Sequence, residues 1–126
     1  MNINNLSGLQ IMQEMCNDNL PIPSMATTIP MSASEVKLGH VTFLVKADER
    51  HLNPMGNVHG GFAATVLDSV TDCAVFSMLE AGLSYTTIDL NVKMCRPIPL
   101  NTELKAVAKT INISKNLGIA EAQLWD

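Results

Sequence analysis

The sequence predicts an α+β fold in which an antiparallel β-sheet wraps one long, buried central helix. Three observations support this prediction. Residues 60–82 are apolar almost all round a helix, the segments after them alternate between apolar and polar residues, and residues 116–118 form a turn that joins two strands. With 126 residues, of which 47% are hydrophobic and 16% charged, the chain suits a single domain, 1–126.

The first predicted element is an N-terminal helix over residues 6–20, whose apolar residues recur close to the helical period. Ser7 is placed to cap this helix, and Pro21 and Pro23 end it. Residues 21–33 are then expected to cross the domain in an extended conformation. We expect this helix to pack against the domain and to carry no chemistry.

Four strands are predicted in the rest of the chain. Residues 35–48 alternate between apolar and polar side chains, with a bend at Gly39. Residues 84–95 alternate most regularly of all and are expected to form a strand after the long helix. Residues 102–113 and 119–125 are expected to follow as a hairpin.

A loop of turn-forming residues, 53–58, leads into His59, Gly60 and Gly61 at the start of the long helix. The first N–H groups of a helix have no partner within it, and two glycines leave these groups uncovered. Such N–H groups, at the positive end of the helix dipole, favour an oxyanion. The alternative is a tight loop that simply needs two flexible residues.

The polar residues of the long helix gather on one face. They fall within an arc of about 100° and are Thr65, Asp68, Ser69 and Asp72. One interpretation is a solvated stripe, with both carboxylates facing water. The other is a general base held in a water-poor cleft, because a buried carboxylate is costly without a reason for it.

The spacing of the two features constrains how they could act together. Gly60 and Asp68 are eight positions apart, which is about 12 Å along a helix axis. One small carbonyl group cannot contact both of them on the same helix. If both are catalytic, one must come from a second copy of the chain, and the site then lies across a two-fold dimer interface.

The composition excludes several classes of protein. A net charge of −4 argues against nucleic-acid binding, and no segment reaches the roughly 18–20 uncharged apolar residues that span a membrane. The N-terminus lacks the pattern of a signal peptide. The three cysteines and three histidines lack the spacing of disulfide frameworks or zinc sites. We therefore expect a cytoplasmic protein with reduced cysteines and no metal.

One stretch resembles a known signature. Residues 53–61, Asn-Pro-Met-Gly-Asn-Val-His-Gly-Gly, with Asp68 seven residues after the second glycine, resemble the signature of hotdog-fold acyl-CoA thioesterases of the phenylacetate-degradation (PaaI-like) type. The resemblance continues in residues 81–92, 96–97 and 120–126, so it covers nearly the whole chain.

The resemblance implies a hotdog fold, in which an antiparallel sheet wraps a long central helix. It also implies a homodimer with a continuous sheet, or a tetramer of two such dimers, with sites between subunits. This agrees with the spacing of Gly60 and Asp68. The family has one more strand after the segment that ends at Asp126. Either the sequence is truncated there or one position of the sheet is empty, which would leave an exposed edge.

The resemblance also implies catalytic roles for the residues at matching positions of this sequence. Asp68 is then the general base or nucleophile that acts on the thioester. The N–H of Gly60 is the donor that polarises the carbonyl oxygen, with Gly61 as the weaker candidate. A carboxylate, an oxyanion donor and an oriented water can hydrolyse a thioester without metal or cofactor.

Further residues are assigned to orientation and substrate binding by the same resemblance. Asn53 and His59 are expected to orient the substrate and the attacking water, and Thr87 is expected to lie near that water. The phosphates of coenzyme A need cations, and the candidates are Arg50, Lys93, Arg96 and Lys115. Phe62 is a candidate for lining the acyl slot. Asp72 has no assigned role.

Three functions follow from these observations. The first is hydrolysis of a small, medium-chain or aromatic acyl-CoA to the free acid and CoA. The second is another hotdog enzyme, such as a dehydratase or a thioesterase acting on acyl-carrier protein. The position of His59 before the two glycines counts against a dehydratase. The third is a non-catalytic acyl-CoA-binding module, which has no need of an acid such as Asp68.

Overall fold

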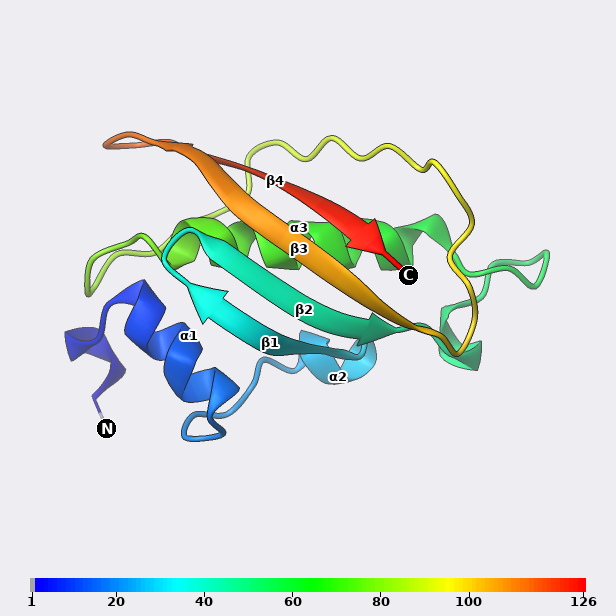
Figure 1. Ribbon diagram of the computed structural model, residues 1–126, viewed down its shortest axis with the longest axis horizontal. Coiled ribbons are helices and arrows are strands. Elements are labelled where there is room, and N and C mark those ends of the chain that lie inside the picture. Colours follow the sequence, from blue (N-terminus) through cyan, green and yellow to red (C-terminus); the bar gives the residue numbers. More distant parts are fainter. Residues whose placement is uncertain (1) are drawn as a thin grey trace.

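The computed structural model describes residues 2–126. Within these residues, four antiparallel strands form one sheet in the order β1-β2-β3-β4, and the sheet curves over one long helix (Figure 1). The strands are β1 (Met31–Lys37), β2 (His40–Lys46), β3 (Glu103–Ile113) and β4 (Gly118–Trp125). The helices are α1 (Gly8–Cys16), α2 (Met25–Thr28) and α3 (Gly60–Phe76), with 3-10 turns at Ile3–Asn5 and Glu49–His51. The predicted α+β fold with a long central helix is confirmed.

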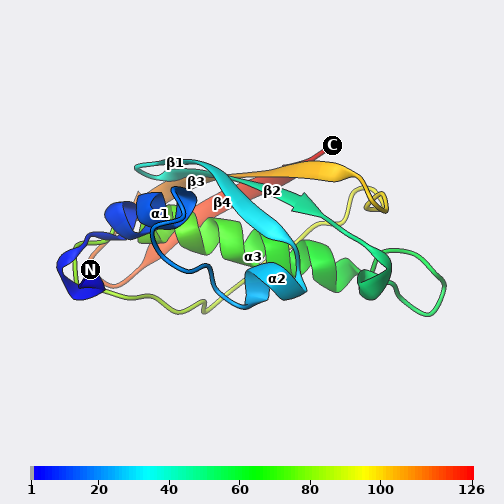
Figure 2. The same ribbon diagram turned by 90° about the horizontal axis from the view of Figure 1, so that it is seen from below.

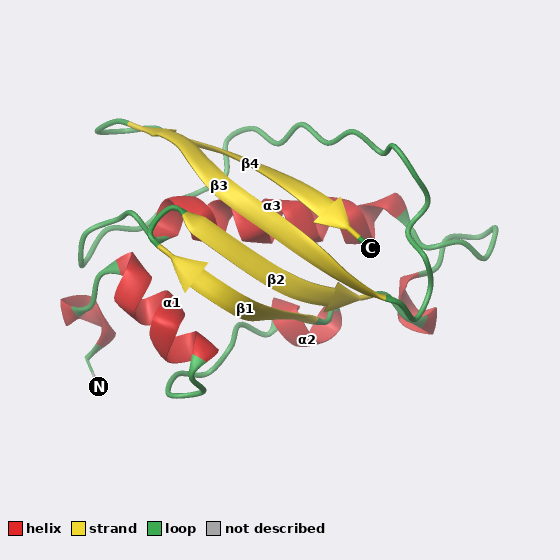
Figure 3. Cartoon of the chain, viewed as in Figure 1, coloured by secondary structure: helices red, strands yellow, loops and turns green. Residues whose placement is uncertain are grey.

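The sheet and α3 form the two main layers of the molecule (Figure 2). α1 packs against β1 and also contacts α3, and α2 contacts β1. A long connection leads from α3 to β3 and runs as a loop along α3, on the β4 side of the sheet (Figure 3). The layer of α3 is therefore flanked by this loop as well as by the sheet.

The core lies between the sheet and α3. Alternate residues of β2 and β3 face the helix, since successive side chains of a strand point to opposite faces. These buried residues are Val41, Phe43, Val45, Leu104, Ala106 and Ala108, and α3 contributes Phe62, Val66, Val70 and Ala74. Full burial of each large apolar side chain contributes about 1.5–3 kcal/mol. This packing buries one face of α3, so that only the opposite face of the helix is left outside the core.

The predicted single strand over residues 35–48 is wrong, because the chain reverses there to form a hairpin. β1 and β2 pair on either side of residues 38–39. Gly39 has a φ of +73°, in the left-handed region that glycine adopts readily, so it reverses the chain instead of bending it. The N–H of Gly39 donates to Oγ of Ser77 at 2.8 Å, which ties the turn to the end of α3.

The N-terminal helix is shorter than the predicted 6–20 and covers Gly8–Cys16. Ser7 caps it as predicted, because its Oγ accepts the N–H of Gln10 at 3.2 Å while the side chain of Gln10 accepts the N–H of Ser7 at 2.8 Å. The extended crossing over residues 21–33 is only partly correct. It contains the short helix α2 and the first residues of β1.

The long helix ends at Phe76, six residues before the end of the 60–82 stretch that the apolar pattern indicates. The hydroxyl of Ser77 donates to the carbonyl of Ala74 at 2.7 Å, and the N–H of Met78 bonds to the carbonyl of Val75, three residues back. Such tightened bonds mark the last turn of a helix. Gly82, with a φ of +84°, belongs to the following turn.

The predicted hairpin of residues 102–113 and 119–125 is confirmed as β3 and β4. The predicted strand over Ser84–Cys95, here called the 84–95 segment, is wrong. Within residues 2–126, its backbone groups make no backbone hydrogen bond. Alternation predicts an extended chain with two faces, but a strand also needs a neighbour that completes the ladder. A groove separates this segment from β4.

Candidate active site

The loop before α3 is closed by the side chain of Asn53. Its Oδ1 accepts the N–H of Met55 at 2.9 Å and the N–H of Asn57 at 3.1 Å. The backbone N–H of Asn53 donates to the carbonyl of Asn57 at 2.7 Å. The oxygen of Asn53 is thus used within the loop, and its NH2 group remains for the predicted contact with a substrate.

His59 is the N-cap of α3. Its Nδ1 accepts the backbone N–H of Gly61 at 2.7 Å, which satisfies one of the free donors of the first turn. A Cβ on residue 61 would lie 2.9 Å from this nitrogen, so the capping contact requires glycine there. Nε2 is the ring nitrogen of His59 that remains to face a substrate.

Gly60 and Gly61 differ in whether their N–H groups are used. Within residues 2–126, the N–H of Gly60 donates to no acceptor, whereas that of Gly61 is bonded to His59. Gly60 is exposed, and a Cβ built on it would first meet the terminal methyl of Met94, at 3.4 Å. An exposed, unbonded N–H at the start of a helix of 17 residues is suited to an oxyanion.

A buried histidine supports this end of α3. His51 is 7% exposed, and its carbonyl accepts the N–H of His59 at 2.7 Å. Its ring nitrogens lie 2.9 Å from the N–H of Asp48 and 2.9 Å from the carbonyl of Thr28. Its ring also packs against that of Phe62, at 5.1 Å between centroids. An isolated histidine in a polar loop gives no sequence signal of such burial.

Two carboxylates and one hydroxyl meet at the middle of α3. Asp68 and Asp72 are one helical turn apart and both are half-buried. Thr87, from the 84–95 segment, places its Oγ1 2.9 Å from Oδ1 of Asp68. The same oxygen lies 3.0 Å and 2.9 Å from the two carboxylate oxygens of Asp72. The structure therefore brings Asp68 and Thr87 together, and it adds Asp72, to which the sequence assigned no role.

Burial sets the electrostatics of this cluster. It raises the pKa of Asp72 to about 6, the hydrogen bond from Thr87 opposes this rise, and the charge of Asp68 adds to it. Burial also raises the pKa of the neighbouring thiol of Cys73 to about 12. A thiol with such a pKa is not a nucleophile near neutral pH.

The 84–95 segment runs antiparallel to α3 and touches it at three levels. The ring of Tyr85 lies 5.6 Å from that of Phe76 near the end of the helix. Thr87 contacts the carboxylates in the middle of the helix, and Met94 lies beside Gly60 at its start. The segment therefore follows α3 from its last turn to its first turn.

A groove of about 1560 Å³ lies between the 84–95 segment, α3 and β4. Asp68, Asp72 and Thr87 line it together with apolar residues of the helix and of β4, such as Leu67 and Leu124. Phe62 is not among the residues that line the groove, since it is 2% exposed and lies in the core. The structure does not place Phe62 where an acyl chain could reach it.

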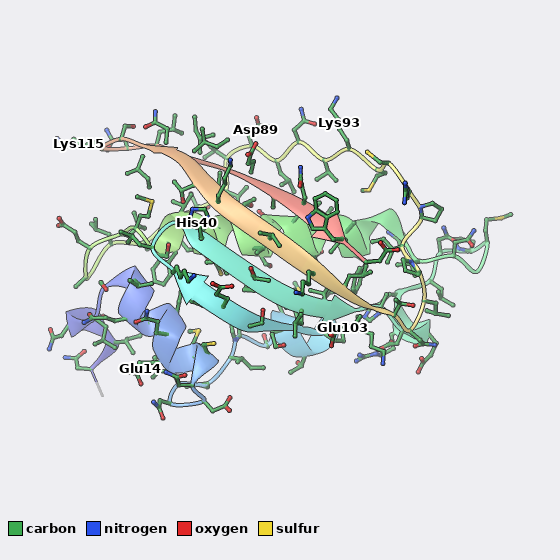
Figure 4. The ribbon with its side chains drawn as sticks, viewed as in Figure 1. Glu14, His40, Asp89, Lys93, Glu103 and Lys115 are labelled. Atoms are coloured by element: carbon green, nitrogen blue, oxygen red, sulfur yellow. The ribbon has the colours of Figure 1, made fainter. Side chains whose placement is uncertain are left out.

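The candidate cations lie at different ends of the molecule. Lys93 extends away from the 84–95 segment, and Lys115 lies at the turn between β3 and β4 (Figure 4). Lys93 directly precedes Met94 and Arg96 follows it by two residues, so both are nearer to the start of α3, whereas Lys115 is near its end. The guanidinium of Arg50 is held by Asp48, at 2.7 Å, and keeps the pKa of that carboxyl well below its usual range.

Gly60 and Asp68 lie on one unbroken helix, so the separation predicted from the sequence applies to the structure. Eight residues of helix place them about 12 Å apart along the axis. Within the described chain, no group of three or more His, Cys, Asp or Glu side chains is placed to hold a metal ion. None of the helices in residues 2–126 is both long and apolar enough to cross a bilayer.

Sequence comparison relates the chain to known proteins. The family model described as the Thioesterase superfamily matches residues 55–126. Acyl-coenzyme A thioesterase 13 of Mus musculus is 30% identical over 80 residues, which cover 64% of this chain and 56% of that protein. Its human counterpart is 28% identical over 86 residues, which cover 68% of this chain and 61% of that protein. The chain thus spans less than two thirds of the length of either relative.

Solved structures share the fold over most of the chain. A phenylacetic acid degradation-related protein from Ralstonia eutropha JMP134 superposes with a TM-score of 0.83 and 28% identity, covering 91% of this chain and 88% of that one. The PaaI protein from the phenylacetic acid degradation operon of E. coli superposes with a TM-score of 0.78 and 17% identity, over 93% and 80% of the two chains. The hotdog fold and the resemblance to PaaI-like proteins are confirmed, and the chain belongs to the Thioesterase superfamily.

Proposed function

We propose that this protein is an acyl-CoA thioesterase that hydrolyses a small, medium-chain or aromatic acyl-CoA to the free acid and coenzyme A. The observation that carries the proposal is the position of Asp68. Its carboxylate lines the groove on a helix that is otherwise mostly apolar, and Thr87 holds one of its oxygens at 2.9 Å. A binding module has no need of a carboxylate at this place.

The proposed reaction follows from the groups around the groove. Asp68 takes a proton from a water molecule as the water oxygen attacks the thioester carbon, or its carboxylate attacks that carbon directly and water then releases the acid. The carbonyl oxygen becomes an oxyanion, which the free N–H of Gly60 stabilises. The C–S bond then breaks, and the thiolate of coenzyme A leaves and takes up a proton.

The site is proposed to be shared between two subunits. A thioester carbonyl cannot span the distance of about 12 Å between Asp68 and Gly60 of the same helix. Asp68 of one subunit therefore acts with Gly60 of the partner subunit, and a homodimer holds two such sites. Asn53 and His59 orient the substrate from the side of Gly60, through the NH2 group and Nε2 that their loop contacts leave free.

The substrate class follows from the same surroundings. Lys93 lies on the 84–95 segment, which passes the start of α3, and Arg96 directly follows that segment, so we assign both to the phosphates of coenzyme A. The acyl group is assigned to the groove, which is lined largely by apolar residues. The name of the mouse relative, an acyl-coenzyme A thioesterase, supports coenzyme A as the carrier of the acyl group. The phenylacetic acid degradation-related structure supports an aromatic acyl group.

The experiment that tests the proposal measures free thiol released from a panel of acyl-CoA esters. The panel includes phenylacetyl-CoA, benzoyl-CoA and straight chains of increasing length. We expect Asp68→Asn to lower turnover by roughly 10²- to 10⁴-fold. Glu103→Gln is the matched control, since Glu103 is an exposed acid that does not line the groove. Tight ester binding without turnover by the wild type would instead favour the binding module.

A further inference from the structure

Thr87 stands between two carboxylates and has one proton to donate. Its Oγ1 lies within 3.0 Å of one oxygen of Asp68 and of both oxygens of Asp72. A hydroxyl donates one hydrogen bond, and an ionised carboxylate donates none. If both acids are ionised, one carboxylate faces the hydroxyl oxygen with no hydrogen between them. If one acid is protonated, it donates to Thr87 and Thr87 donates to the other acid.

The surroundings indicate which acid holds this proton. Burial, with the charge of Asp68, raises the pKa of Asp72 to about 6. The titratable groups that face Asp72 are Asp68 and Cys73 on its own helix and Tyr85 on the 84–95 segment. Burial raises the pKa of both Cys73 and Tyr85 to about 12, so both are neutral near pH 7. The core-facing residues of β4 carry no charge and are Ala120, Ala122 and Leu124.

We propose that Asp72 is a positioning residue for Asp68: its carboxyl group holds a proton that it donates to Oγ1 of Thr87, which directs the hydroxyl of Thr87 at Asp68. This inference rests on the proposed function, in which Asp68 reacts at the thioester. Thr87 then fixes Oδ1 of Asp68 and leaves Oδ2 for water or substrate. Asp72 acts through Thr87 and does not touch the reacting atoms.

Loss of this proton reverses the direction of the hydrogen bond. An ionised Asp72 offers two oxygens to the hydroxyl of Thr87, at 3.0 Å and 2.9 Å, and Asp68 offers one. The hydroxyl then turns to Asp72, and Asp68 loses its donor. The bond that is lost is one hydrogen bond to the charged carboxylate of Asp68. We therefore expect kcat/KM to fall on the order of three- to tenfold as the pH rises through the pKa of Asp72.

Substitutions of Asp72 separate the effect of the donor from that of the titration. The side chain in Asp72→Asn donates to Thr87 at every pH, so we expect no transition near pH 6 and a kcat/KM at pH 8 at or above that of the wild type. Asp72→Ala removes the competing acceptor together with the donor, so the hydroxyl of Thr87 stays free to donate to Asp68, and we expect a flat profile above the level that the wild type reaches at pH 8. A transition near pH 6 that persists in Asp72→Asn would overturn the proposal.

Substitutions of Thr87 test whether the effect passes through its hydroxyl. Thr87→Ser keeps the hydroxyl, and we expect it to keep the pH profile of the wild type. Thr87→Val is similar in size but cannot donate to Asp68, and we expect a flat profile at the low level that the wild type reaches at pH 8. A Thr87→Val enzyme with the profile of the wild type would contradict the proposed route from Asp72 to Asp68.

A measurement without substrate distinguishes failure of this inference from failure of the proposed function. Carbon-13 NMR of the aspartate carboxyl groups in the full chain follows their titration directly. We expect the Asp72 signal to titrate near pH 6, and at lower pH in Asp68→Asn, which lacks the neighbouring charge. If Asp72 titrates near pH 6 but the enzyme hydrolyses no thioester, the inference about the Asp72 proton stands and the proposed function is rejected. Titration of Asp72 near 4 in the wild type would overturn the inference.

Discussion

The first turn of α3 and the middle of the same helix contribute different kinds of chemical group to the candidate site. At the first turn the reactive group is a backbone N–H, that of Gly60, and the side chains of Asn53 and His59 hold the backbone around it. In the middle of α3 the backbone is bonded within the helix, and the groups available for chemistry are the side chains of Asp68 and Asp72, with Thr87 above them.

This difference predicts which part of the site responds to pH. A backbone dipole does not titrate, so the stabilisation that Gly60 provides stays constant over the working range of pH. The carboxylates titrate, and their shared hydroxyl couples them. The pH dependence of the reaction is therefore expected to come from the middle of α3, and the following experiments test this division.

The largest effect expected at the first turn comes from Gly60→Pro. Proline is tolerated at the first position of a helix and lacks an N–H, so the change removes the oxyanion donor and little else. His59 already has the extended backbone that precedes a proline, with φ −63° and ψ 137°. We expect kcat to fall by about 10²- to 10³-fold without a change in the pH profile.

Gly60→Ala is the matched control for this experiment, since it adds a Cβ but keeps the N–H. The added atom would meet only the flexible end of Met94. We expect it to retain most of the activity in the same free-thiol assay. Equal losses in the two variants would indicate a steric effect and would remove Gly60 as the oxyanion donor.

A mixing experiment tests whether the two regions act across subunits. Neither Asp68→Asn nor Gly60→Pro is expected to be active alone. In a heterodimer of the two, Asp68 of one subunit meets Gly60 of the other in one complete site out of two. Random exchange of subunits should therefore restore about a quarter of the wild-type activity. Inactive heterodimers, verified by mass spectrometry, would place both residues in a site within one subunit.

The smallest effect concerns stability. The pKa of Asp72 is raised to about 6 in the folded protein from an ordinary 3.8, so the folded state binds this proton more tightly than the unfolded state. Asp72 therefore lowers stability as the pH rises from about 4 to about 6, and Asp72→Asn removes this penalty. Allowing for partial exposure, we expect the substitution to raise the free energy of unfolding by about 1 kcal/mol at pH 7.5 and by little at pH 4.

Urea unfolding at both pH values measures this difference. Glu103→Gln serves as the control, because it removes an exposed acid that does not line the groove. A stability gain that is equal at pH 4 and pH 7.5 would show that the amide packs better than the acid, independently of any proton.

The sequence predicts those elements whose pattern lies within one short stretch of the chain. The apolar run predicts α3, the alternation and turn predict β3 and β4, and the glycines predict the exposed helix start. The hairpin at Gly39 was missed because the alternation of β1 and β2 continues across the turn. The end of α3 was missed because it depends on Ser77, whose hydroxyl bonds to the distant N–H of Gly39.

The candidate site shows the same limit. The face shared by Asp68 and Asp72 follows from helical periodicity, but the sequence does not reveal that Thr87 lies between their carboxylates. Thr87 follows Asp68 by 19 positions and Asp72 by 15. Its contact with both therefore depends on how the 84–95 segment packs along α3. Phe62 was a candidate for lining the acyl slot, and its burial against His51 is a property of the folded core.

The 84–95 segment has a consequence for the exchange of amide hydrogens with solvent. Slow exchange requires an N–H that is hydrogen-bonded, as the N–H groups between β3 and β4 are. Tyr85, Thr87 and Met94 contact α3 through their side chains, while the backbone N–H groups of the whole segment bond to no backbone carbonyl within residues 2–126. Deuterium uptake in this segment should therefore be fast, and any strand that pairs with it in an assembly would be revealed by new protection at alternate residues.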